Sequence, residues 1–292
     1  MVYLIVTSLI WAFSFGLIGN VLKGLDPLSV ASVRLVVALV VFLPFVRPGR
    51  VAVRDRWFLM LLGAIQFGLM YVCYLSAFRF IPSHLVALFS VLTPVYVVLI
   101  HSLRKKRISA HYLLAALLSV AGASVIKVKA GESGQFWAGF GLMQLAGLAF
   151  AYGQVEYRDW KRKHAALRDR DAFGLLYVGG AVLALVASSV LSPGAPAIPQ
   201  ASPTQWLVMC YLGAVASGLG FFFWNVGAAR STPGALAACN NAVVPMAMFA
   251  SLFVFGEISD VRAGDLVRLG LGAVLIAAAV VIGQRGQPTA RE

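Results

Sequence analysis

The sequence contains few charged residues. Only 12% of its 292 residues are charged and 60% are hydrophobic, whereas about a quarter of a typical soluble domain is charged. So little polar surface cannot cover a water-facing globule. The same figures argue against a disordered chain and against a soluble coiled coil. The composition instead predicts an all-α polytopic membrane protein.

Cysteine and clustered reactive groups are also scarce. The three cysteines, Cys73, Cys210 and Cys239, lie in apolar segments without CxxC spacing or a neighbouring histidine, which argues against a disulfide framework and a zinc site. No HExxH, Ser–Lys, Asp–Asp or histidine cluster is present, so we expect neither a membrane-embedded enzyme nor a bound metal or cofactor. The short loops disfavour a receptor with an extramembrane domain.

Most of the charge is positive. The chain has 24 Lys and Arg against 11 Asp and Glu, for a net charge of +13. In a soluble domain this excess would suggest nucleic-acid binding. Here the cations lie in short gaps between apolar segments, so the excess fits the positive-inside rule and no nucleic-acid partner is expected.

Ten apolar stretches are each long enough to cross a bilayer, which takes about 20 residues. They are residues 2–19, 28–46, 58–80, 83–102, 111–127, 137–155, 172–191, 206–228, 234–255 and 265–283. Loops on one side hold 17 Lys and Arg and loops on the other side hold 5. This asymmetry predicts that both termini are cytoplasmic.

The two halves of the chain resemble each other. The string LGAI at 62–65 parallels LGAV at 212–215, and Pro94 parallels Pro245. Each half holds five spans, and this odd number inserts the second half upside down. We therefore predict two inverted five-helix repeats, residues 1–130 and 131–292. Such repeats are typical of secondary transporters, whose site lies between the halves near the midplane.

Arg34 is the strongest candidate for a binding residue. It lies inside the second span, where a charged side chain is costly and marks a functional site by default. Its planar fork suits an anionic group such as a carboxylate, while snorkelling to the headgroups is the alternative. No acid lies at mid-span. Glu156, at the end of the sixth span, and His84, near the start of the fourth, are the candidate titratable groups.

Other polar and aromatic side chains inside the spans predict a cavity lining. Pro94 and Pro245 free the carbonyl groups of Ser90 and Asn241, so we expect kinks in two gating helices beside a wet cavity. Aromatic walls with a few amides and hydroxyls suit a mid-sized, partly apolar metabolite. For each aromatic residue, packing against lipid is the alternative. The other predicted lining residues are Trp11, Ser14, Gln66, Tyr71, Tyr74, Thr93, Gln144, Tyr152, Trp224, Asn225 and Asn240.

These features resemble the EamA-like drug/metabolite transporter superfamily. The strings LIWAFSF at 9–15 and VLTP at 91–94, with Gln144 and the pairs at 224–225 and 240–241, are similar to its carboxylate/amino acid/amine transporter branch, and most of all to the biotin importers of bacteria. The resemblance implies a central cavity lined by spans 1–4 and 6–9, in a multi-pass protein of the bacterial inner membrane. It also implies biotin uptake without a cofactor.

The implied substrate fits the lining residues. Biotin has a carboxylate for Arg34, a ureido ring for amides such as Asn225, Asn241 and Gln144, and a thioether ring for aromatic walls. An exporter of amino acids, amines, drugs or other metabolites would have a similar cavity, so this alternative stays open. The lack of a mid-span acid disfavours ion-coupled transport, although His84 could titrate. His84 also departs from the family pattern, which has an acid at this position, so the resemblance does not carry a coupling role over to it. Small residues on the fifth and tenth spans allow a homodimer.

Overall fold

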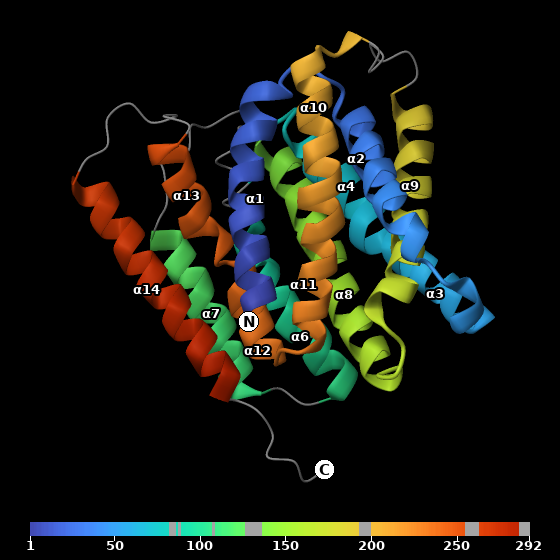
Figure 1. Cartoon of the computed structure of the whole chain (residues 1–292). Coiled ribbons are helices and arrows are strands. Elements are labelled where there is room, and N and C mark those ends of the chain that lie inside the picture. The colour runs from blue at the N-terminus through green and yellow to red at the C-terminus, as the bar shows by residue number, and fades with distance from the viewer. Residues whose placement is uncertain are drawn as a thin grey trace.

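The computed structural model is a bundle of helices (Figure 1). It describes residues 1–81, 86, 89–106, 109–125, 136–192, 200–254 and 263–285. Every regular element in these ranges is helical. The α-helices are α1 (Val2–Val21), α2 (Pro27–Phe42), α3 (Val53–Gly63), α4 (Met70–Ala77), α6 (Thr93–Lys105), α7 (Ala110–Val125), α8 (Phe136–Lys163), α9 (Asp169–Leu191), α10 (Pro203–Tyr211), α11 (Gly220–Ala229), α12 (Pro233–Asn240), α13 (Val243–Phe253) and α14 (Ala263–Arg285). The 3₁₀ turns are η1 (Leu43–Phe45), η2 (Pro48–Arg50) and η4 (Ser90–Leu92), and the π-helices are η3 (Ala64–Leu69) and η6 (Leu212–Leu219).

Within the described residues, seven helical segments are long and apolar enough to cross a membrane. They are Val2–Val21, Pro27–Phe45, Val53–Ala77, Phe136–Lys163, Asp169–Leu191, Pro203–Ala229 and Leu266–Gly283, and each overlaps a predicted span. The other three predicted spans correspond to the shorter helix α7, to η4 with α6, and to α12 with α13. The length criterion therefore identifies a multi-pass helical protein, but it does not count ten spans.

The helix α8 is longer than the apolar run that predicts it. The run ends at residue 155, but the helix continues to Lys163 through a charged segment. Its last turn carries Lys161, Arg162 and Lys163, and positive charge stabilises the C-terminal end of a helix. Hydropathy therefore locates the membrane-embedded part of this helix and not its end.

Three helices begin with the same local signal, a capping side chain followed by proline. Asp26 accepts a hydrogen bond from the Ser29 amide at 2.8 Å and begins α2. Ser202 and Gln205 form a capping box at α10, and Thr232 caps α12. A capping oxygen satisfies an amide that has no partner within the helix, and proline fits the first turn because no amide hydrogen is needed there.

The two π-helices lie at matching places in the two halves of the chain: η3 directly follows the repeated LG dipeptide at 62–63, and η6 begins with the LG dipeptide at 212–213. The glycine of each dipeptide allows close helix contact. A Cβ on Gly63 would lie 1.9 Å from the Leu176 carbonyl oxygen of α9, and one on Gly213 would lie 2.7 Å from the Val37 Cβ of α2. The repeated string thus encodes one local geometry twice, and π-helical turns frequently mark functional sites.

Packing also follows a matching pattern. The helix α9 packs on η3 as α2 packs on η6, and α8 packs on α4 and α6 as α1 packs on α11 and α13. Helices α7 and α14 lie side by side at one edge of the bundle, and the N terminus lies at the same end as the end of α14 (Figure 1).

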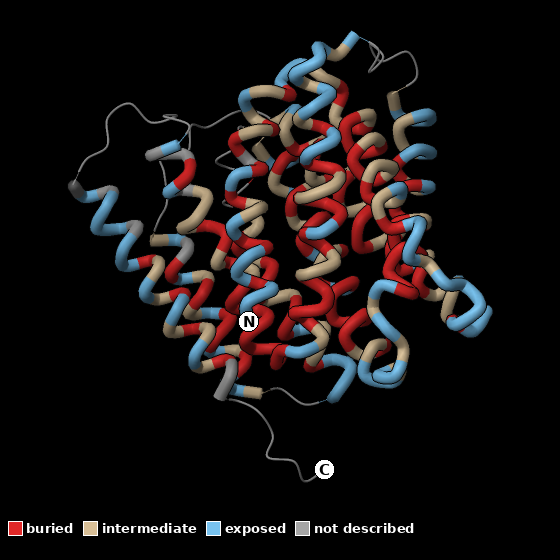
Figure 2. Tube along the Cα trace, in the orientation of Figure 1, coloured by how far each residue is buried: buried red, intermediate tan, exposed pale blue. Residues whose placement is uncertain are grey.

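Burial separates the middle of the bundle from an apolar exterior. Figure 2 shows the buried residues gathered along the inner helices and the exposed ones along the outer faces. Large apolar side chains stand on those faces, including Trp137, Leu207 and Val274, which are 76%, 71% and 66% exposed. Such an exterior would be a liability in water and is what a lipid-facing surface requires.

Two interrupted helices meet inside the bundle. One interruption is η4, directly before α6, whose first turn contains Pro94. The other lies between α12 and α13, two residues before Pro245. The Asn241 side chain donates a hydrogen bond to the Val91 carbonyl at 3.1 Å and so joins the two interruptions. Backbone groups released from the helices are thereby partly satisfied inside the protein.

Candidate functional site

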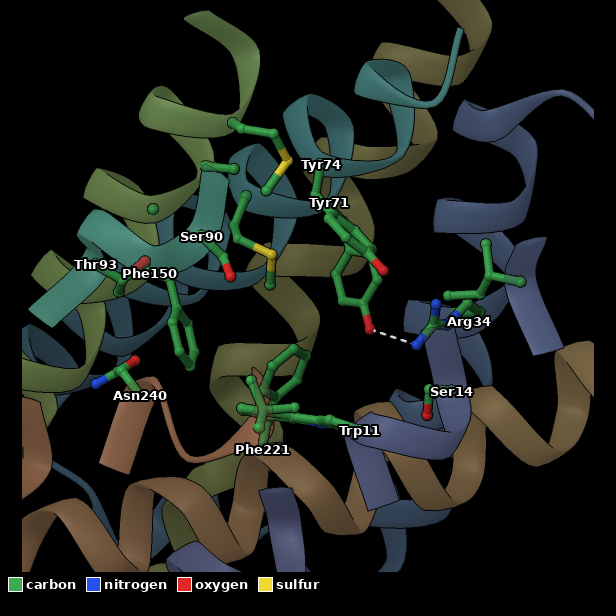
Figure 3. Close-up of a pocket in the computed structure, with 16 residues that line it drawn as sticks. Trp11, Ser14, Arg34, Tyr71, Tyr74, Ser90, Thr93, Phe150, Phe221 and Asn240 are labelled. Carbon is green, nitrogen blue, oxygen red and sulfur yellow. Dashed lines mark hydrogen bonds between the residues drawn. The ribbon is translucent and has the colours of Figure 1, made fainter. Parts of the chain in front are cut away.

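An open pocket lies inside the bundle, between α1, α2, α4, α8, α11 and the two interrupted helices (Figure 3). The empty space inside it is about 800 Å³ when the part open to solvent is included. The lining residues are Trp11, Ser14, Ile18, Arg34, Met70, Tyr71, Tyr74, Ser90, Thr93, Met143, Ala146, Gly147, Phe150, Phe221, Asn240 and Val243.

Arg34 is buried in the wall of this pocket, with only 2% of its surface exposed. Its Nη2 donates a hydrogen bond to the Tyr71 hydroxyl at 2.7 Å, and its Cζ lies 4.7 Å from the centre of the Tyr71 ring. Its Nε and Nη1 are buried without a hydrogen-bond partner among the described residues. Unpaired buried donors are costly, so this guanidinium is suited to bind an acceptor that enters the pocket.

A chain of hydroxyl groups holds Arg34 in place. The Tyr71 hydroxyl, on α4, also lies 2.9 Å from the Ser217 Oγ in η6. The Ser217 carbonyl in turn accepts a hydrogen bond from the Tyr177 hydroxyl of α9 at 2.7 Å. Four helical segments are thus connected at this wall. The π-helical turn of η6 contributes both the hydroxyl and the carbonyl of Ser217 to the network.

No described acid is placed to neutralise Arg34. The acids with described side chains are Asp26, Asp55, Glu156, Asp159, Asp169 and Asp171. Asp26 pairs with Arg79, Asp55 with Trp160 and His164, and Glu156 with Arg104. Asp159 pairs with Arg104 and Arg158, Asp169 with Tyr157, and Asp171 with Arg50 and Arg170. None of these acids lines the pocket. The positive charge on Arg34 is therefore left uncompensated by this part of the protein.

Aromatic rings form the wall beside Arg34. The Trp11 ring lies 5.3 Å from Phe221, 5.7 Å from Phe150 and 5.0 Å from Trp224, measured between ring centres. The Trp11 Nε1 donates to the Ala216 carbonyl at 2.9 Å, so its only donor is satisfied inside the protein. The pocket consequently meets apolar faces here, which suit a hydrocarbon or thioether ring.

Ser90, Thr93 and Asn240 lie across the pocket from Arg34 (Figure 3). The side-chain amide of Asn240 is joined to that of buried Gln154 by two hydrogen bonds of 3.3 Å. Trp224 donates to the same Gln154 oxygen at 2.9 Å. This end of the pocket is polar and uncharged, so the lining runs from a cation through aromatic rings to hydroxyl and amide groups.

The structure brings together eight of the predicted lining residues in this pocket. They are Trp11, Ser14, Arg34, Tyr71, Tyr74, Ser90, Thr93 and Asn240. Glu156 is away from it, paired with Arg104. His84 lies outside the described residues.

The other predicted lining residues are placed elsewhere. Gln66 donates to Asn225 at 3.1 Å, and Trp224 and Asn241 bond inside the bundle as described above. Gln144 accepts from Tyr96 at 2.9 Å. Tyr152 is 36% exposed. These polar groups are not among those that line the pocket.

The sequence analysis missed three pocket residues on one face of α8. Met143, Gly147 and Phe150 line the pocket and are spaced three or four residues apart, so they share a face. Gln154, a polar residue of the same apolar span, continues this face and supports Asn240 and Trp224. The signal that could have identified them is this spacing, since apolar residues carry no individual mark of facing a cavity.

Comparisons with known proteins identify the family to which this chain belongs. Residues 1–128 match the model of the EamA-like transporter family. A Pseudomonas aeruginosa protein named "Probable biotin transporter" is 39% identical over 291 residues, or 99% of each chain. The "Biotin transporter" proteins of Salmonella typhimurium and Escherichia coli are 36% identical over 88% of this chain and 85% of their own length.

A solved structure shares the fold. It is described only as the crystal structure of a protein, is 16% identical to this chain and covers 97% of both chains with a TM-score of 0.73. At this identity the match speaks for the fold alone.

Proposed function

The chain belongs to the EamA-like transporter family, and from that premise we propose that it imports biotin across the bacterial inner membrane. Relatives with 36–39% identity over most of their length are named biotin transporters. The pocket supports the same substrate class, because its lining offers one buried cation, an aromatic wall and a neutral polar end.

The observation that carries the proposal is the pair of unpartnered donors on Arg34. The biotin carboxylate pairs with the guanidinium charge and accepts a charge-assisted hydrogen bond from one of these donors. The bicyclic ring packs against Trp11, Phe150 and Phe221, and the ureido group reaches Ser90, Thr93 and Asn240. Gln66, Trp224, Asn225 and Asn241 act behind the lining, where they hold the helices that form it.

We also propose that transport proceeds by alternating access between two inverted five-helix repeats, residues 1–130 and 131–292. Three observations support the repeat. They are the π-helices at matching places in the two halves, the hydrogen bond that joins the two helix interruptions, and the matching pairs of packed helices. Pro94 and Pro245 then sit at the bends of the gating helices. The end of the bundle that holds the N terminus and the last residues of α14 is cytoplasmic, as the excess of Lys and Arg in the loops on that side predicts.

Uptake of radiolabelled biotin by a biotin-requiring strain tests the function. Cells that express the chain should take up biotin above the empty-vector level. Arg34→Ala should abolish this uptake. Arg34→Lys should weaken it, because the ammonium keeps the charge and loses the planar fork. Arg268→Ala is the matched control, since Arg268 also lies in an apolar helix but its side chain is exposed on α14.

The outcomes separate import from the alternatives. Uptake no higher than with the empty vector, from a correctly expressed protein, contradicts the import of biotin. Binding of biotin to the purified protein without uptake would instead favour an exporter. Normal uptake by both Arg34 variants would show that the guanidinium does not bind the substrate.

A further inference from the structure

We propose that this transporter exchanges carboxylate-bearing solutes across the membrane faster than it performs net uptake. The reason is that its site is electrically neutral during reorientation only when a carboxylate is bound. The inference rests on the proposed function in one respect: the substrate carboxylate binds at Arg34. It adds an exchange activity, with small monocarboxylates bearing a neutral polar ring as the class exchanged.

The first observation is the state of the Arg34 charge. The side chain is 2% exposed, and its Nε and Nη1 have no partner among the described residues. Its guanidinium contacts the hydroxyl and the ring of Tyr71, both of them neutral groups. The described acids are all bound to other partners, and none lines the pocket.

The second observation is that three helices beside the pocket are joined to one another. Trp224 on α11 and Asn240 on α12 are both bonded to Gln154 on α8, and Asn240 lines the pocket. To expose the site to the opposite side, a carrier of this kind passes through a state in which the pocket is closed at both ends. While the pocket is open, water can solvate the two unpaired donors. In the closed state that solvation is largely lost.

The cost of closure therefore depends on the occupant. An uncompensated ion in a region of low dielectric constant is strongly disfavoured, whereas an ion paired in good geometry is not. A bound carboxylate supplies both the opposite charge and a hydrogen-bond acceptor for one of the unpaired donors. The loaded carrier consequently reorients faster than the empty one, and return of the empty carrier limits net uptake.

The same charge balance predicts an electrical difference. A loaded site carries +1 from Arg34 and −1 from the carboxylate, so it is neutral, while the empty site carries +1. Exchange moves only loaded carriers in both directions and transfers no charge. Net uptake returns the empty, positive carrier outward and is opposed by a membrane potential that is negative inside.

Efflux from preloaded vesicles tests the proposal. The full-length protein is reconstituted in proteoliposomes loaded with labelled biotin, and efflux is followed into buffer with or without saturating unlabelled biotin. External biotin should accelerate efflux about tenfold or more. A tenfold acceleration corresponds to about 1.4 kcal/mol of extra barrier for reorientation of the empty carrier. A potassium diffusion potential, negative inside, should slow net uptake and leave the exchange rate unchanged.

The Arg34→Lys variant tests the role of the charge in the same vesicles. It keeps the charge, so acceleration by external biotin should persist although more biotin is needed to saturate it. Equal efflux with and without external biotin, in vesicles that do take up biotin, overturns exchange and leaves the biotin importer intact. Net uptake that does not respond to the potential overturns the charge argument. Absence of any biotin uptake overturns the proposed function together with this inference.

Discussion

Two arginines in this bundle are buried equally, at 2% exposure, in contrasting surroundings. Arg34, on α2, faces the pocket with two unpaired donors and no described acid beside it. Arg158, near the end of α8, donates through Nε to the Ser231 carbonyl at 3.1 Å and lies 3.6 Å from the Asp159 carboxylate. Asp159 and Glu156 also pair with Arg104.

The difference shows how to interpret a buried charge in a membrane protein. Arg158 Nη1 is also buried without a hydrogen-bond partner, but this arginine has a counter-charge in Asp159 and an acceptor in Ser231, so we interpret its role as structural, tying α8 to the loop before α12. Arg34 has no counter-charge among the described acids, so we propose that the acceptor it needs comes from a ligand. Burial alone does not separate the two roles, whereas the inventory of partners does.

The largest expected effect comes from removing the pocket cation. Arg34→Gln should weaken biotin binding at least 100-fold, about 3 kcal/mol, because the carboxylate loses its charge partner. Isothermal titration of the purified protein measures the dissociation constant. The melting temperature without ligand should not fall, since the substitution removes an uncompensated buried charge. A dissociation constant within threefold of that of the unmodified protein would contradict the assignment of Arg34.

Arg158→Gln should show the opposite behaviour. Its loss should cost about 1–3 kcal/mol of stability, because the Ser231 carbonyl and the Asp159 carboxylate lose a charged donor. Thermal unfolding in detergent measures this, and biotin affinity should stay unchanged. A variant that unfolds normally but fails to bind biotin would place Arg158 in the transport path and remove the contrast between the two arginines.

A smaller effect should follow from loosening Arg34 without removing it. Tyr71→Phe deletes the hydroxyl that accepts from Arg34 and contacts Ser217. The guanidinium is then less well oriented, and the affinity for biotin should fall about tenfold, or about 1.4 kcal/mol. Tyr157→Phe is the matched control, since its hydroxyl bonds to Asp169 away from the pocket. Equal affinity losses in both variants would point to a general packing defect.

The smallest effect concerns a third arginine, Arg79, which is paired at the bundle surface with Asp26. Burial by itself would raise the pKa of Asp26, but hydrogen bonds from Ser29 and Ser192 and the nearby Arg79 guanidinium hold it below its ordinary value. A lowered pKa in the folded state means that the stabilisation is complete above the unfolded value of about 4 and is lost as the pH falls below it.

Asp26→Asn isolates that charge, because asparagine retains the helix cap. The melting temperature of the unmodified protein should decline more steeply below about pH 4 than that of the variant. The ion pair should contribute less than about 1 kcal/mol to the free energy of unfolding, since the Arg79 side chain is 44% exposed and solvent screens the pair. Parallel curves for the two proteins would show that the ion pair contributes nothing.

Much of the site could be predicted from residue type and depth. Arg34 stands out because a charged residue inside an apolar span is rare, and it does lie in the pocket wall together with Trp11, Tyr71 and Tyr74. Tyr152 and Gln66 satisfied the same criterion, yet one is partly exposed and the other is bonded to Asn225. A linear pattern gives the depth of a side chain but not the direction in which it points.

The sequence by itself determined that the chain crosses a membrane several times, where its apolar helices lie and that a cation is buried among them, because hydropathy and helix signals depend on residues close in the chain. Only the tertiary structure decided which buried arginine has no counter-charge in the described part of the chain. That outcome depends on side chains brought together from distant helices, such as Tyr71 and Ser217 beside Arg34. Pairing of this kind is a property of packing, and no local pattern records it.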